Sequence, residues 1–371
     1  MDQFFTPLWD LGSWFGAPTS SEIVDEKPTR STPFLDIPAD VMLLITDQLD
    51  APSALSLAHS CKSLYALNAC QHYKQMRAED QKEFLLLLER DPLGKGTYYC
   101  HPCNKLHPFQ QTWGPHSESE ISKESGVYHC GNRDRFSPIG NAFDLSFTHA
   151  KLVMNNHFYG PEYGVPIENL CIEHDERRDA TNIHCITSAK ILDDELFIQR
   201  TYTFTVTDSD VQEFRKCTGA RDFRLCEHTS FFSNNSIYRQ YVPELQRRPS
   251  DGGEGLVACR EVPGSCGLCL MDYDITINPS EDGKAWLMTI QAYHQVGSCR
   301  SPDDWKWARF TESCRPHLFF PNRPNRRGSI HNPGTVRIRW SDEESQALKA
   351  AAEEASKGSG FWSSMFPVGL W

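Results

Sequence analysis

The sequence has 371 residues and a formal net charge of −12, with 39% hydrophobic and 23% charged residues. This length is typical of two or three domains with a sizeable core, and the negative charge argues against general binding of nucleic acids or anionic membranes. No segment approaches the roughly 20 continuous apolar residues that a membrane helix needs.

The N-terminal segment lacks the features of a secretion signal. Asp2 is acidic, no Lys or Arg precedes Lys27, and no uninterrupted apolar stretch follows. We therefore expect the protein in the cytoplasm or the nucleus. In that reducing environment, CxxC spacing among the 14 cysteines favours metal ligation over disulfides. Residues 1–33 contain four prolines and no regular period, which predicts a disordered arm.

Residues 34–91 are expected to form four helices because their apolar residues recur with the helical period of 3.6. Pro38 suits the first turn of the first helix, and Ser53 is the expected cap of the second. The fourth helix ends before Pro92. It lies within residues 76–97, which we expect to link two domains.

From residue 98 onward, glycines, prolines, cysteines and short alternating segments predict a β-rich domain of the α+β class over residues 98–314. The clearest strand is 196–206, and a hairpin is expected over 273–292. Helices are expected over 149–158 and after Asp208. The strand face that we expect to be buried comprises Leu196, Ile198, Tyr202, Phe204 and Val206.

The C-terminal part is basic and then aromatic. Residues 315–340 contain six arginines and no acidic residue. This composition fits phosphate recognition on a modified substrate, nuclear import, nucleic-acid contact or a solvated loop. Over 341–371 we expect a helix that begins with a Ser341–Glu344 capping box and stops at Gly358, followed by an aromatic tail.

An ordered pattern marks residues 34–75. It consists of Ile37-Pro38, an apolar helix, a leucine-rich turn and Cys61-Lys62 before Leu64. This stretch resembles an F-box, which implies a trihelical module that docks on the Skp adaptor of cullin-based SCF ubiquitin ligases. From pattern alone, a helical subdomain packed on its own chain is the alternative. The adaptor contacts that the resemblance implies are Ile37, Pro38, Val41, Leu44, Ile45, Leu49, Leu55, Leu57, Cys61 and Leu64.

The stretch YYCHPCNKLHPF combines two cysteines and a histidine. Cys100 and Cys103 can place two thiolates on one ion across a tight turn, and His107 adds a third ligand. Cys130 is the expected fourth ligand, with His129 as its rival, and four ligands would make a closed zinc site. Unligated buried cysteines are one alternative. A redox pair is less favoured, because we expect no strand before this CxxC and no helix after it.

A second candidate metal site joins two distant segments. Its ligands are Cys226 and His228 with Cys266 and Cys269, so the sequence predicts up to two structural zinc ions. Cys259 and Cys217 are alternative ligands. The cysteines that lie in apolar or amphipathic runs, most of which we expect in the core, are Cys61, Cys70, Cys171, Cys185 and Cys314.

Longer pieces of the middle region form a recognisable set: "YYCHPCNKLHPF", "FTHAKLVMNNHFYGPEYGVPI", "SCGLCLMDYDITI" and "YHQVGSCRSPDDWKW". Together they resemble a group of fungal proteins that pair an F-box with this Cys/His-rich region. No activity is established for the region. The resemblance therefore implies a recognition or scaffold role by association only.

The sequence offers no enzyme motif of the HExxH, GxSxG, Walker A or GxGxxG type. Asp193, Asp194 and Glu195 fit a solvated turn better than a hydrolytic acid pair. Four protein ligands leave a zinc ion no open position, which favours structural over catalytic metal.

These observations together predict a non-catalytic substrate receptor of an SCF-type ubiquitin ligase. The expected partners are the Skp adaptor, a cullin and an unknown substrate protein, without membrane or nucleic acid. The alternatives are a cullin-independent F-box interaction or scaffold protein and a zinc-dependent enzyme.

Overall fold

The computed structural model describes residues 37–60, 64, 77–115, 135–138, 143–178, 181–215, 223–232, 240–253, 255–311 and 331–341. The chain divides into two compact units, Met1–Met76 and Arg77–Trp371. Helices and strands both occur, which confirms the α+β class. The expected disordered arm and all of the expected third helix except Leu64 lie outside the described residues.

The first unit contains α2 (Ala39–Asp47) and α3 (Ala51–His59). Pro38 was expected in the first turn of α2, but it is the N-cap residue directly before the helix. The predicted cap of α3 was also wrong. Asp50 is the cap, because its Oδ1 accepts a hydrogen bond from the backbone N of Ser53 at 3.0 Å. Ser53 thus lies inside the helix, and the aspartate three residues earlier satisfies its free N–H group.

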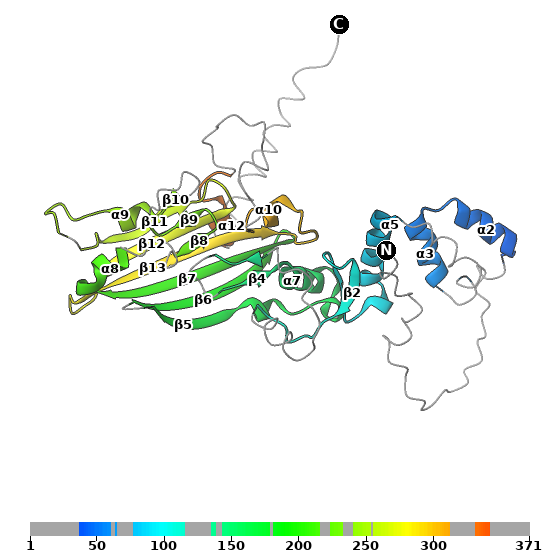
Figure 1. Ribbon diagram of the computed structural model, residues 1–371, viewed down its shortest axis with the longest axis horizontal. Helices are drawn as coiled ribbons and strands as arrows, with labels where there is room; N and C mark the ends of the chain where they lie inside the picture. Colours follow the sequence, from blue (N-terminus) through cyan, green and yellow to red (C-terminus); the bar gives the residue numbers. More distant parts are fainter. Residues whose placement is uncertain are drawn as a thin grey trace, which may run out of the picture. The chain divides into compact units, whose positions relative to one another are not determined.

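The second unit combines short helices with a large sheet (Figure 1). Its helices are α5 (Ala78–Arg90), α7 (Phe147–Tyr159), α8 (Val211–Arg215), α9 (Pro243–Gln246), α10 (Trp305–Ala308) and α12 (Thr335–Trp340). Its 3-10 helices are η3 (Pro92–Gly94), η4 (Pro161–Tyr163), η5 (Ile167–Leu170) and η6 (Asp208–Asp210). Its strands are β1 (Thr97–Cys100), β2 (Lys105–Pro108), β3 (Arg135–Phe136), β4 (Leu145–Ser146), β5 (Ile172–Arg178), β6 (Thr181–Leu192), β7 (Glu195–Thr207), β8 (Arg224–Cys226), β9 (Thr229–Ser230), β10 (Gln240–Tyr241), β11 (Cys259–Ser265), β12 (Met271–Pro279) and β13 (Ala285–Gly297).

Six strands form one antiparallel sheet in the order β11-β12-β13-β7-β6-β5, and Figure 1 shows them side by side. Strand β7 confirms the strand predicted over 196–206. The pair β12–β13 confirms the predicted hairpin, with Ile275 opposite Ile290. Smaller sheets pair β1 with β2 and β3 with β4, and a third places β9 between β8 and β10.

The inner face of the sheet carries the core. All five apolar residues predicted for the buried face of β7 are at most 1% exposed. The same face also carries Arg200, which is 1% exposed and which the prediction left out. Its guanidinium lies 4.4 Å from the ring centroid of Phe143 and 4.9 Å from that of Tyr202. Stacking on aromatic rings thus accompanies the burial of this cation.

Rings from the segment around β8 and β9 cover the inner face of β7. Phe204 lies 5.0 Å from Phe231, and Tyr202 lies 5.1 Å from Phe223, as ring-centroid distances. Helix α7 begins where Ser146 accepts a hydrogen bond from the backbone N of His149, and it ends at Gly160, where φ is 99°. The predicted helix over 149–158 is therefore confirmed.

The opposite, outer face of the sheet holds α12. This helix lies within the segment 315–340, where we expected a solvated or recognition loop, so that expectation was wrong for residues 335–340. Val336 is fully buried and Trp340 is 8% exposed. Their spacing of four residues places both on one side of a helix. Ser341, which we expected to cap a following helix, is the C-cap residue of α12. Residues 312–330 and 342–371, which include Glu344 of the expected capping box, lie outside the described part.

Candidate metal centres and adaptor face

Two tight turns build the first candidate metal centre, called here the four-ligand site. Cys226 ends β8, and His228 lies just before β9, so both belong to the turn that joins these strands. Cys266 and Cys269 lie in the turn that joins β11 to β12. The two turns are far apart in the sequence, but the structure brings all four predicted ligands together.

The four-ligand site is closed and buried. Its three sulfur atoms and one imidazole nitrogen all lie within 4.8 Å of one another. The cysteines are 0% exposed and His228 is 4% exposed. Tetrahedral zinc with Zn–S bonds of about 2.3 Å needs sulfur atoms about 3.8 Å apart. The four side chains could therefore hold a metal ion, and a tetrahedral ion such as zinc would be coordinated by all four of them.

Burial and mutual hydrogen bonds shift the pKa values of the three thiols of this site in different directions. Burial raises the pKa of Cys226, and it raises the pKa of Cys269 well above the usual thiol value. Burial also opposes ionisation of Cys266, but hydrogen bonds from Cys226, Cys269 and His228 lower its pKa to well below the usual value. A buried thiolate surrounded by further sulfur and nitrogen donors is the donor set that a soft divalent cation such as zinc takes.

Neighbouring groups hold the two turns of the four-ligand site in place. The backbone N of Leu268 lies 3.4 Å from Cys266 Sγ. Gln240 connects both halves, because its backbone N donates to the carbonyl of His228 at 2.7 Å and its Oε1 accepts from the backbone N of Gly267 at 3.1 Å. Such outer contacts orient metal ligands and are part of a built site.

The second candidate centre, called here the β1–β2 site, brings together three predicted ligands. Cys100 ends β1, Cys103 lies in the turn, and His107 is on β2, with their ligand atoms within 4.8 Å of one another. Burial lowers the pKa of His107, which keeps its imidazole neutral and able to bind a metal. The expected fourth ligand, Cys130, and its rival His129 lie outside the described residues.

The turn of the β1–β2 site also corrects one expectation. We expected no strand before this CxxC, but β1 ends at Cys100. A second strand follows the turn, so no helix N-terminus faces the thiols as it does in common redox CxxC motifs. Asn104 forms the turn with φ of 51°, and its backbone N donates to the carbonyl of Cys100 at 2.9 Å.

Sequence reasoning missed a buried ion pair behind the β1–β2 site. Glu89 of α5 and Lys151 of α7 meet at 2.6 Å, and both side chains are almost fully buried. Glu89 accepts a hydrogen bond from the backbone N of Tyr99, and Lys151 donates to the carbonyl of the same residue. The pair thus holds the strand that leads to Cys100. A lysine within the otherwise apolar run AKLVM was the available signal.

Two of the five cysteines that we expected mostly in the core are described. Cys171 is exposed and Cys185 is half-buried, so the expected core placement was wrong for Cys171. Its strand-edge position explains this, because it directly precedes β5. Cys259 is half-buried and belongs to neither group of candidate ligands. Cys61, Cys70, Cys217 and Cys314 lie outside the described part.

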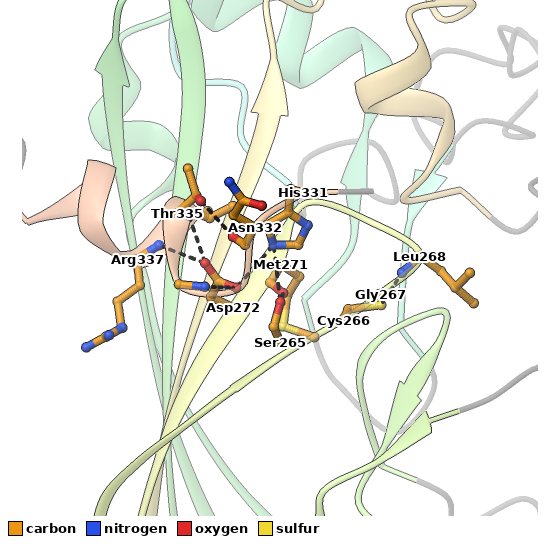
Figure 2. A network of polar contacts seen from close by, with 12 residues as sticks. Ser265, Cys266, Gly267, Leu268, Met271, Asp272, His331, Asn332, Thr335 and Arg337 are labelled. Carbon is orange, nitrogen blue, oxygen red and sulfur yellow. Dashed lines mark hydrogen bonds and ion pairs between the residues drawn. The ribbon is translucent and has the colours of Figure 1, made fainter. Parts of the chain in front are cut away.

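A Ser–His–Asp set occurs near the four-ligand site, but its geometry is not that of a catalytic triad. Figure 2 shows His331 between Ser265 and Asp272. The same atom, His331 Nε2, lies 3.2 Å from Ser265 Oγ and 3.1 Å from Asp272 Oδ1. A carboxylate only accepts hydrogen bonds, so Nε2 carries a proton and cannot take one from the serine.

The predicted acidic turn is confirmed. Asp193 and Asp194 join β6 to β7 with φ of 51° and 60°. Glu195 is bound by Lys306 and Gln295, and Asp194 contacts His157 at 2.8 Å. These carboxylates serve packing and turn formation.

The predicted adaptor contacts divide into two classes. Four of them are exposed apolar side chains, and we call them the α2 face: Val41 (43% exposed), Leu44 (65%), Ile45 (38%) and Leu49 (37%). In contrast, Leu55 and Leu64 are 1% and 6% exposed. In this conformation those two leucines are core residues and offer no contact surface, which corrects their expected role.

The other predicted contacts include exposed and half-buried residues. Pro38 is exposed, whereas Ile37 and Leu57 are half-buried, and Cys61 lies outside the described residues. Val41, Leu44 and Ile45 lie on one side of α2 because they are three to four residues apart, and Leu49 follows two residues after the helix ends at Asp47. The opposite side of α2 packs inward through Met42 and Thr46, which are 4% and 2% exposed.

No family model matches the sequence, and comparisons with curated proteins and with solved structures find no match either. Among the described residues, no helix is long and apolar enough to cross a membrane. The F-box resemblance therefore stays a prediction.

Proposed function

We propose that this protein is a non-catalytic substrate receptor of an SCF-type ubiquitin ligase. One observation carries the proposal: four apolar side chains stand exposed on the α2 face within a unit that is compact by itself. A soluble protein rarely leaves a contiguous apolar stripe uncovered unless a partner covers it. The partner that fits the F-box-like pattern is the Skp adaptor, which would connect the protein to a cullin.

In this proposal the second unit holds the target protein. Zinc in the four-ligand site and in the β1–β2 site would fix the turns that carry the ligands. The receptor accelerates ubiquitin transfer by proximity, since it raises the effective concentration of the target near the transferring enzyme. No acid–base pair of its own is needed. The exposed α2 face supports adaptor binding by the first unit, and the buried four-ligand site supports a structural role for a metal in the second unit.

The test is adaptor binding by the full-length protein. We expect Leu44→Asp to weaken binding of a purified Skp adaptor at least about 30-fold, since loss of a central apolar anchor costs about 2 kcal/mol or more. Leu93→Asp is the matched control, because Leu93 is a 56% exposed leucine of the second unit. Unchanged adaptor binding by a folded Leu44→Asp variant would contradict the proposal. Adaptor recovery without a cullin from cells would favour the scaffold alternative.

A second candidate function is a zinc-dependent enzyme centred on the β1–β2 site. The observation that favours it is the set of three described ligands, of which Cys103 and His107 are only half-buried. Three protein ligands and one water are the composition of catalytic zinc sites. Full zinc binding by both Cys130→Ser and His129→Ala variants would indicate an open fourth position and support the enzyme. Loss of one zinc in either variant would indicate a closed structural site.

A further inference from the structure

Helix α12 is anchored on the sheet by one buried carboxylate. Asp272, on the outer face of β12, is 0% exposed. It accepts hydrogen bonds from the backbone N atoms of Gly334, Val336 and Arg337 at 3.0, 2.8 and 3.1 Å. Figure 2 shows Asp272 beside Arg337 and His331. The N–H groups of a first helical turn have no partner within the helix. A helix of six residues does not persist alone in water, so α12 depends on this anchor.

The same carboxylate is joined to the four-ligand site. Strand β11 ends at Ser265 and β12 begins at Met271, so the turn between them carries Cys266 and Cys269. Ser265 and Asp272 face each other across the two strands. His331 bridges them through Nε2. Ser265 therefore lies directly before the turn and Asp272 shortly after it, and both contact the segment that contains α12.

We propose that α12 is a metal-dependent latch, whose docking on the outer face of the sheet requires an occupied four-ligand site. With zinc bound, metal–sulfur bonds fix the turn and keep Ser265 and Asp272 opposite each other. Without zinc, the four side chains are no longer held by a common ion, so the turn between β11 and β12 becomes more mobile. Asp272 then no longer caps α12. This inference rests on the zinc binding assumed in the proposed function.

Release of the latch changes the charge of the surface. In the docked state, Arg337 Nε lies 3.7 Å from Asp274, and Arg339 Nη2 lies 3.1 Å from Asp193. The guanidinium of Arg339 also covers the ring of Phe197 at 4.8 Å. Undocking separates these pairs. It makes both arginines available to an acidic or phosphorylated target and uncovers carboxylates on the sheet.

Hydrogen exchange of the full chain, followed by mass spectrometry, tests the latch. After zinc removal by a chelator, we expect amides of Thr335–Trp340 to exchange roughly tenfold faster. The reference amides, in α7 and in the centre of β7, should keep their protection, and added zinc should restore α12. Unchanged exchange of α12 in zinc-free protein refutes the latch. Equal loss of protection in α7 also refutes it, because the metal would then hold the whole unit.

Two variants separate the latch from the zinc site itself. Asp272→Asn keeps the shape but loses one acceptor oxygen, so we expect normal zinc content and fast exchange of α12 even with zinc bound. Asp274→Asn is the matched control, since Asp274 contacts Arg337 but caps no helix N–H group. Full protection of α12 in Asp272→Asn would overturn the inference. Elemental analysis that finds no zinc in any preparation would instead refute the zinc site.

Discussion

The buried pair of Glu89 and Lys151 allows a quantitative prediction. Lys151 Nζ lies 2.6 Å from Glu89 Oε1, and the side chains are 4% and 2% exposed. At this distance and an effective dielectric constant of about 20, the attraction is roughly 6 kcal/mol. Desolvation of the two ions offsets most of it. Burial lowers the pKa of Lys151 even though the charge of Glu89 acts to raise it, which shows that desolvation is large.

Lys151→Met removes the cation and leaves the carboxylate buried. Glu89 would keep only its hydrogen bonds from the backbone N of Tyr99 at 2.8 Å and from Asn155 Nδ2 at 3.1 Å. A buried charge without its partner costs about 3–5 kcal/mol, so we expect the free energy of unfolding to fall by that amount. Urea unfolding followed by tryptophan emission measures it, since all described tryptophans belong to the second unit.

The double variant Glu89→Gln/Lys151→Met is the control for this prediction. Glutamine keeps an acceptor oxygen for the backbone N of Tyr99 but carries no charge. We therefore expect the double variant to recover at least about half of the lost stability. A loss below about 1 kcal/mol in Lys151→Met, or a double variant that is less stable than the single one, would refute the reasoning.

Three further predictions follow from the structure. Cys269→Ser should lower the zinc content by one equivalent per chain relative to the exposed control Cys171→Ser, as measured by elemental analysis; equal zinc in both would contradict the four-ligand site. Gly164→Ala should lower the free energy of unfolding by about 1–3 kcal/mol or more in urea unfolding, because the new Cβ would lie 1.9 Å from the carbonyl oxygen of Leu152 in α7. The control Gly283→Asn, in open space at φ of 66°, should lower it by less than about 1 kcal/mol. Burial opposes ionisation of Asp272, but hydrogen bonds from His331 and other donors lower its pKa; its stabilisation is therefore present above the unfolded pKa of about 4 and is lost as the pH falls through the folded value. Exchange of α12 should accelerate in that acid range in the wild type, and Asp272→Asn should show a smaller pH dependence.

Local patterns predicted the elements whose own residues alternate clearly. β7 and the β12–β13 hairpin have apolar residues at every second position, so one buried face was visible in the sequence. Other strands lacked this signal. β5 is mostly charged and exposed because it is an edge strand, and only its pairing with β6 makes it a strand. Arg200 was missed for a related reason, since the rings that stack on its guanidinium include Phe143, which is distant in the chain.

The metal centres show the same division. CxxC and CxH spacing is a local property, because each pair reaches one ion from a single turn. Which pairs share an ion is not local. The halves of the four-ligand site come together because β8, β9 and β10 pack beside the end of the β11–β12 hairpin, where Gln240 hydrogen-bonds both turns.

For this protein the sequence alone determined the α+β class, the helical character of the N-terminal unit, the strongest strands and both groups of candidate metal ligands. These features depend on residues that are near one another in the chain, where periodicity and turn geometry operate. Only the tertiary structure decided that Leu55 and Leu64 are core residues, that the ion pair of Glu89 and Lys151 supports β1, and that Asp272 anchors α12. Burial and capping across the fold arise from contacts between distant segments, and no local pattern encodes them.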